Sequence, residues 1–122
     1  MRIVLAVLMA VHGVAHLVGF AGAWKLVPGG FPYRTTVLGG QVDLGNAGIR
    51  AVGLLWLITA VAFVTVAVGA VAGVAWWAPA ALAIATVSLL LTVLEFPEAH
   101  TGAVIDIAII MALGAGWWLR QI

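Results

Sequence analysis

The sequence contains no cysteine and very few charged residues. Without cysteine there can be no disulfide, no thiolate metal site and no cysteine nucleophile. Only 7% of the 122 residues are charged, whereas roughly a quarter are charged in an ordinary soluble domain. The formal net charge of +1 provides no basic surface for nucleic acid. These shortages exclude thiol chemistry and argue against a nucleic-acid partner.

Several motifs that carry enzymatic chemistry are also absent. The chain has no glycine-rich phosphate loop, no serine in a nucleophile elbow and no lysine within a long apolar run. It therefore lacks the usual signatures of nucleotide, acyl-enzyme and Schiff-base chemistry.

Apolar residues are abundant instead, at 66% of the chain. They form long runs separated by short polar stretches, and each run suits a helix that crosses a bilayer in about 20 residues. We expect an all-α integral membrane protein, a four-transmembrane-helix antiparallel bundle, in which residues 1–122 form one domain. The predicted helices cover about 3–24, 44–71, 76–94 and 102–119, and 31–44 is predicted to be an interfacial loop. Orientation stays open, because Arg2 and Arg120 on one face balance Lys25 and Arg34 on the other.

The segment 94–106 stands out because it holds three of the four acidic residues, Glu95, Glu98 and Asp106. An ionisable group inside a span is expensive and is usually turned toward the bundle interior. His12 and His16 are four residues apart, so they lie on one face of the first helix. The sequence thus predicts one polar pocket, in the membrane half that contains the 94–106 segment.

Each of the other helices is expected to turn one polar stripe toward this pocket. The stripes are Asp43, Ala47, Arg50 and Leu54 on the second helix, Ser88, Thr92 and Glu95 on the third, and Gly102 and Asp106 on the fourth. The proposed acids, bases and relays are Asp106, Glu98, Glu95, His16, His12 and His100. The proposed substrate-orienting or structural residues are Arg50, Asp43, Tyr33 and Asn46.

Structural roles are the alternatives to these assignments. Arg50 could instead form a bridge to Asp43 or Asp106, since buried charges are normally paired. His12 and His16 could be hydrogen-bonded core residues. Because no metal or cofactor is required by the acid/base reading, none is predicted, but the spacing of the two histidines leaves a metal or a haem open as an alternative.

The favoured function is a small intramembrane enzyme that performs general acid/base chemistry, such as isomerisation, cyclisation or epoxide opening, on a lipophilic small molecule. Its expected partners are that molecule and membrane lipid. The alternatives are a homo-oligomer that relays protons or transports a substrate, and an accessory subunit of a larger membrane complex.

Three motifs are spread along the chain, and the resemblance that they carry covers nearly the whole of it: His12-Gly13-x-x-His16-x-x-Gly19-Phe20, Arg50-x-x-Gly53-Leu54-Leu55-Trp56, and Pro97-Glu98-Ala99-x-x-Gly102. In these the sequence resembles a family of small bacterial four-helix integral membrane proteins with no assigned activity. The resemblance implies the same architecture and a bacterial cytoplasmic membrane. Members of that family carry asparagine where Asp106 stands here and arginine in place of His100, which implies that this chain has been adapted for acid/base work.

Overall fold

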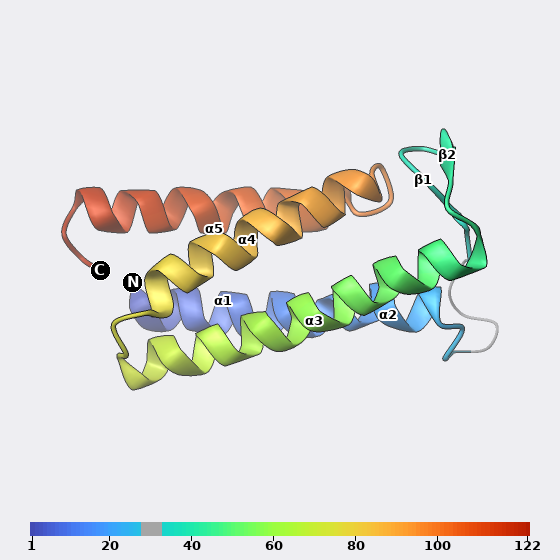
Figure 1. Ribbon diagram of the computed structural model, residues 1–122. Coiled ribbons are helices and arrows are strands. Elements are labelled where there is room, and N and C mark those ends of the chain that lie inside the picture. The colour runs from blue at the N-terminus through green and yellow to red at the C-terminus, as the bar shows by residue number, and fades with distance from the viewer. Residues whose placement is uncertain (28–32) are drawn as a thin grey trace.

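The computed structural model describes residues 1–27 and 33–122 (Figure 1). Within these residues, four helical segments are long and apolar enough to cross a membrane. The first consists of α1 and α2, and the others are α3, α4 and α5. Their bounds are Arg2–Ala15 for α1, Leu17–Ala23 for α2, Gly45–Ala72 for α3, Trp77–Leu94 for α4 and His100–Trp118 for α5. The prediction of an all-α, four-span integral membrane protein is confirmed.

The observed helix ends lie within two residues of the predicted ones. One difference is a break in the first span, where the helical pattern is interrupted at His16 between α1 and α2. The side chain of His16 explains the break: its Nδ1 donates to the carbonyl of His12, which also accepts from the backbone N–H of His16. A side chain that competes for a helical carbonyl disturbs the turn it belongs to.

The helices follow one another around the bundle. The first span packs along α3, α3 packs along α4, and α4 packs along α5, whereas α1 and α5 touch only sparsely. The seam between the first and last spans is therefore the least closed side of the bundle. The two chain termini lie near each other at one end, as expected for an even number of spans (Figure 1).

A short hairpin covers the opposite end of the bundle (Figure 1). Strand β1 (Thr36–Val37) pairs antiparallel with β2 (Val42–Asp43), and the backbone N–H of Leu38 donates to the carbonyl of Leu94 at 2.8 Å. This hairpin lies within the predicted interfacial loop 31–44, and residues 28–32 lie outside the described part of the chain. The contact attaches the hairpin to the end of α4, beside Glu95.

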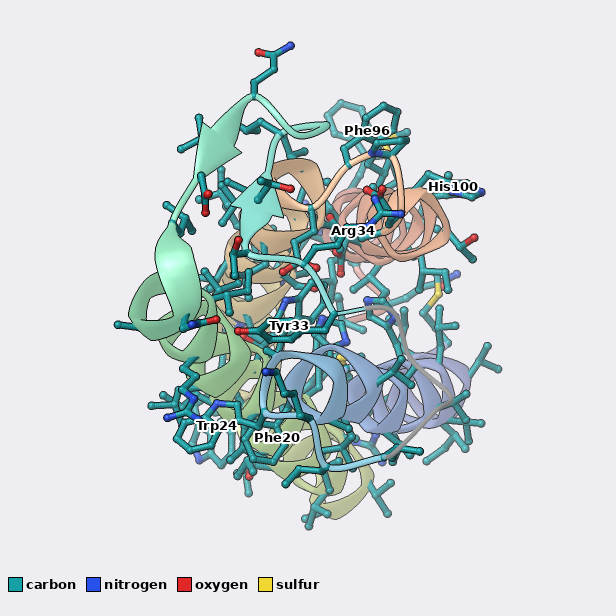
Figure 2. The ribbon with its side chains drawn as sticks, turned by 90° about the vertical axis from the view of Figure 1, so that its right-hand side faces the viewer. Phe20, Trp24, Tyr33, Arg34, Phe96 and His100 are labelled. Atoms are coloured by element: carbon teal, nitrogen blue, oxygen red, sulfur yellow. The ribbon has the colours of Figure 1, made fainter. Side chains whose placement is uncertain are left out.

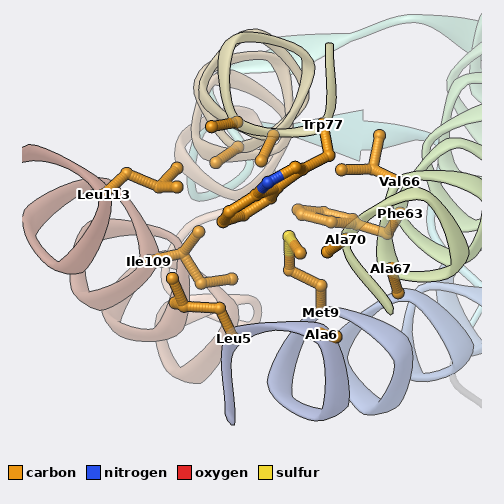
Figure 3. Packing of buried hydrophobic residues seen from close by; sticks show 13 residues of the cluster. Leu5, Ala6, Met9, Phe63, Val66, Ala67, Ala70, Trp77, Ile109 and Leu113 are labelled. Carbon is orange, nitrogen blue, oxygen red and sulfur yellow. The ribbon is translucent and has the colours of Figure 1, made fainter. Parts of the chain in front are cut away.

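The membrane half that contains the termini is filled by an apolar core (Figure 3). Its largest enclosed side chains are Leu5, Met9, Phe63, Ile109 and Leu113. Trp77 joins this core with 6% of its surface exposed. Trp76 and Trp118 do lie at the surface, as expected for interfacial anchors.

Candidate functional site

Four buried polar side chains form a continuous hydrogen-bonded chain across the middle of the bundle. His12 Nε2 lies 2.8 Å from Asp106 Oδ1, Ser88 Oγ lies 2.8 Å from Asp106 Oδ2, and His16 Nε2 lies 2.7 Å from Ser88 Oγ. All four side chains have at most 3% of their surface exposed. The chain links the first span to α4 and α5, and it crosses the loosely packed seam between α1 and α5. We refer to His12, Asp106, Ser88 and His16 as the polar chain.

The hydrogen bonds of the polar chain limit which of its atoms can carry protons. His16 Nδ1 faces a carbonyl oxygen, so it must carry a proton. The single hydroxyl proton of Ser88 can serve either His16 Nε2 or Asp106 Oδ2, but both atoms lie at hydrogen-bond distance. One further proton, on His16 Nε2 or on Asp106, completes both bonds.

His12 carries the end of the polar chain that can act on another molecule. When its Nε2–H donates to Asp106, its Nδ1 carries a lone pair. Nδ1 makes no hydrogen bond within the described residues, but part of its surface is still accessible. Nδ1 is therefore not fully enclosed, and His12 lines a cavity.

That cavity has a volume of about 440 Å³ and lies between the first span, α3 and the start of α5. This volume falls within the usual range for small-molecule sites, about 300–1,000 Å³. Its polar lining comes from His12, His16, Trp56, Thr92, Glu95, Glu98 and Thr101. Asp106 and Ser88 do not line the cavity. Asp106, predicted from the sequence to act directly as an acid, is thus placed behind His12.

The cavity has different surroundings on its two sides. Val18 of α2 and Thr101 of α5 line it and are exposed on the membrane-facing side of the protein. On the hairpin side, a smaller cavity of about 80 Å³ shares Gly19, Gly22, Glu95 and Glu98 with it. Arg34 lines this smaller cavity and forms an ion pair with Glu98. The site thus borders lipid on one side and the polar end of the bundle on the other.

Glu95 follows the last residue of α4 and lies at the junction of the two cavities. Burial raises the pKa of its carboxyl, the indole N–H of Trp56 opposes this rise, and the charge of Glu98 adds to it. Glu95 therefore holds its proton over a wider pH range than an exposed glutamate. Glu95 and Glu98 were both predicted at the site, and both line the cavity.

The predicted orientation of the second span is wrong. Asp43, Ala47, Arg50 and Leu54 are all exposed, whereas α3 turns Trp56 and Phe63 inward. The guanidinium of Arg50 lies 5.4 Å from the ring centre of Trp24, and the indole N–H of Trp24 donates to the Arg50 carbonyl. The alternative bridges from Arg50 to Asp43 or Asp106 do not form in the described part of the chain. Near the membrane surface, a charge on an aromatic face avoids the cost of full burial.

Asp43 acts next to the start of α3, as a structural residue rather than a site residue. Its carboxylate accepts the backbone N–H of Gly45 at 2.9 Å. This bond lowers the pKa of Asp43, and a further bond from Thr35 adds to the effect. Asp43 therefore has a structural role next to the first turn of α3, and a role in orienting a substrate has no support from its position.

Of three other predicted residues, His100 and Tyr33 lie at the hairpin end (Figure 2), and Asn46 is the hydrogen-bond partner of Tyr33. His100 is exposed at the outer edge of this end, and its Nδ1 donates to the Pro97 carbonyl. Tyr33 donates its hydroxyl proton to Asn46, and Lys25 lies over the Tyr33 ring. None of these residues lines the 440 Å³ cavity. They hold the loops of this end together.

The geometry bears on the metal and haem alternative. In residues 1–27 and 33–122, no group of three histidine, aspartate or glutamate side chains is arranged to hold a metal ion. Both ring nitrogens of His16 and one of His12 are already hydrogen-bonded. Within the described residues, only His12 Nδ1 of these four nitrogens is free to bind a further group.

Two members of the site were not identified as functional residues from the sequence. Ser88 and Thr92 were expected to face the pocket, but the role of Ser88 in joining His16 to Asp106 was not predicted. Trp56 was not predicted to take part at all. The sequence does contain one signal of a close neighbour on this face, because Gly19 lies one turn beyond His16. In the structure this neighbour is Trp56, since a Cβ built on Gly19 would lie 2.7 Å from its ring.

Comparisons with protein-family models, with curated proteins and with solved structures give no match for this chain. Fold and site therefore define the class: an integral membrane four-helix bundle with a buried polar chain beside a cavity.

Proposed function

We propose that the protein is a small membrane enzyme that moves protons on a lipophilic small molecule by general acid/base catalysis. The observation that carries this proposal is the arrangement at His12, where a buried aspartate orients the imidazole of a residue that lines a cavity and whose other nitrogen has no hydrogen bond within the described residues. An aspartate in this position holds the tautomer that leaves the distal nitrogen basic and stabilises the imidazolium that forms.

The proposed steps use two groups that line the cavity. His12 Nδ1 removes a proton from the bound molecule, and the neutral carboxyl of Glu95 donates one. Asp106 is a positioning residue in this scheme, and Ser88 and His16 keep its second oxygen bonded. Such proton transfer underlies isomerisation, cyclisation and epoxide opening alike. It needs no cofactor, and the substrate reaches the site from the membrane of what we propose to be a bacterial cell.

The two alternative functions, a proton-relaying or transporting homo-oligomer and an accessory subunit, receive less support from the described residues. A proton relay across one protomer would have to pass the apolar core around Met9 and Phe63, which contains no titratable side chain. An accessory subunit could dock through an open small residue such as Gly114, but docking alone would leave the buried contact between His12 and Asp106 without a role.

The test begins with protein purified from its own host, followed by native mass spectrometry and extraction of any bound molecule. The extracted molecule is then incubated with the protein in deuterated water, and deuterium incorporation is measured. We expect exchange at a carbon position to fall about 10²–10⁴-fold in His12→Gln, the usual contribution of a general base. His100→Gln, which changes an exposed histidine, should exchange like the wild type. Equal exchange by His12→Gln and the wild type would refute the proposal.

A further inference from the structure

The indole N–H of Trp56 is a hydrogen-bond donor without an acceptor. Trp56 lines the cavity with 6% of its surface exposed, and Nε1 has no hydrogen-bond partner within the described residues. It is the single enclosed side-chain nitrogen or oxygen in that part of the chain for which this holds. A donor placed in this way is costly unless something accepts its proton, because burial has already removed water from it.

The surroundings of Trp56 keep its ring in one orientation. The ring lies against Gly19 on α2, where a Cβ would come within 2.7 Å of it, and its centre lies 4.9 Å from that of His16. The carboxyl of Glu95 lies near enough for the indole N–H to lower its pKa, but the two groups do not meet the geometry of a hydrogen bond. The indole N–H and Glu95 therefore occupy neighbouring positions on the cavity wall.

We infer that the cavity binds a neutral lipophilic molecule through one acceptor oxygen, such as that of a ketone, ether or epoxide, which Trp56 and Glu95 hold between them. Both groups donate: Trp56 through its indole N–H and Glu95 through its carboxyl proton. Burial raises the pKa of Glu95, so this carboxyl holds its proton to a higher pH than an exposed glutamate does. The inference rests on the proposed function in requiring a small molecule in this cavity, and it names the class of that molecule.

Anionic ligands fit this wall poorly. Glu98 also lines the cavity, and its one cationic partner, Arg34, is already engaged with it. A purely hydrocarbon ligand would leave the Trp56 N–H without an acceptor. A site built to hydrogen-bond an oxygen strongly rejects the analogue that lacks it.

The test compares cyclododecanone with cyclododecane, two rings that differ in one carbonyl oxygen, added to the protein in detergent micelles. The readout is the set of indole N–H signals of the six tryptophans in a two-dimensional ¹H–¹⁵N spectrum. The Trp56 signal is identified by its loss in Trp56→Phe. We expect the ketone to move this signal downfield and to bind about tenfold more tightly than the hydrocarbon.

Trp56→Phe should abolish this preference, whereas Trp118→Phe, at a residue 87% exposed, should retain it. Equal affinities of the wild-type protein for the two rings, or an unmoved Trp56 signal, would overturn the inference, and the comparison of wild-type affinities stands even where Trp56→Phe does not fold. Binding needs no turnover. Ketone preference without deuterium exchange would defeat the proposed enzyme alone, and exchange without ketone preference would defeat this inference alone.

Discussion

At the scale of single residues, Asp106 has the role that is most specific to this chain. Its two oxygens hold His12 and Ser88, and its surface is fully enclosed. In Asp106→Asn, the amide can present a hydrogen-bond donor to His12 Nε2 and thereby favour the opposite imidazole tautomer. We expect turnover to fall about 10²–10⁴-fold while the protein remains folded.

The ¹⁵N shifts of His12 provide the decisive measurement for Asp106→Asn. The proton should move from Nε2 in the wild type to Nδ1 in the variant, which loss of packing alone would not cause. An unchanged tautomer together with lost turnover would mean that Asp106 does not act through His12.

Ser88 joins the two halves of the polar chain. Ser88→Ala leaves His16 Nε2 without its partner and leaves Asp106 Oδ2 with only a long contact to Thr92 at 3.5 Å. A buried group that loses its partner costs about 1–3 kcal/mol, so we expect the free energy of unfolding in detergent to fall by about that amount. Thr86→Val is the matched control on α4, since Thr86 is exposed and bonds only the Leu82 carbonyl. A loss no larger than that of the control would mean that Ser88 is not needed to satisfy its neighbours.

Glu95 should make the free energy of unfolding depend on pH, in a direction that follows from its raised pKa. Burial raises its pKa, so the folded protein binds this proton more tightly than the unfolded chain. The associated stability is complete below the ordinary pKa of glutamate and is lost as pH rises through the raised value. We expect Glu95→Gln to match the wild type at about pH 4 and to unfold at a higher temperature at about pH 8. Parallel curves of unfolding temperature against pH would show that Glu95 titrates normally.

At the scale of helices, close packing of the first span on α3 depends on glycine. A Cβ on Gly13 would lie 2.7 Å from the Phe63 Cβ and 3.1 Å from the Ala60 carbonyl oxygen, so the backbones would have to separate. We expect Gly13→Ala to lower the free energy of unfolding by about 1–3 kcal/mol, as overpacking does. Gly114→Ala is the control, because nothing lies within 4 Å of its Cβ position. It should be neutral or stabilise by up to about 1 kcal/mol, since alanine favours helix more than glycine does.

Helix positions could be predicted from the sequence, but the direction that one helix faces could not. Long apolar runs closed by Gly73 or Pro97 place span ends within two residues, because membrane thickness and turn chemistry act locally. The residues of α3 are apolar on every side, so periodicity gives no direction, and Arg50 was taken to face inward. The structure turns Trp56 inward instead, because placing the charge of Arg50 at the membrane interface costs less than losing the packing of the Trp56 ring.

The polar chain was predictable in part for the same reason. A buried aspartate must find partners, so His12 and Asp106 at similar depth could be brought together from the sequence alone. Which atoms meet depends on packing between α1, α4 and α5. The link through Ser88 and the withdrawal of Asp106 behind His12 therefore appear only in three dimensions.

At the scale of the whole molecule, the two membrane halves have opposite character. One half holds the polar chain and the cavities, and the other is packed with aliphatic and aromatic side chains (Figure 3). Protons need a line of water or titratable groups to cross a membrane, and the core around Leu5, Met9 and Ile109 offers neither to a single protomer. We therefore expect proteoliposomes that contain the protein and a pH-sensitive dye to leak protons no faster than protein-free liposomes under an applied pH gradient. A flux that appears with the wild type and vanishes in Asp106→Asn would assign the polar chain to conduction, and it would replace catalysis as the role of His12.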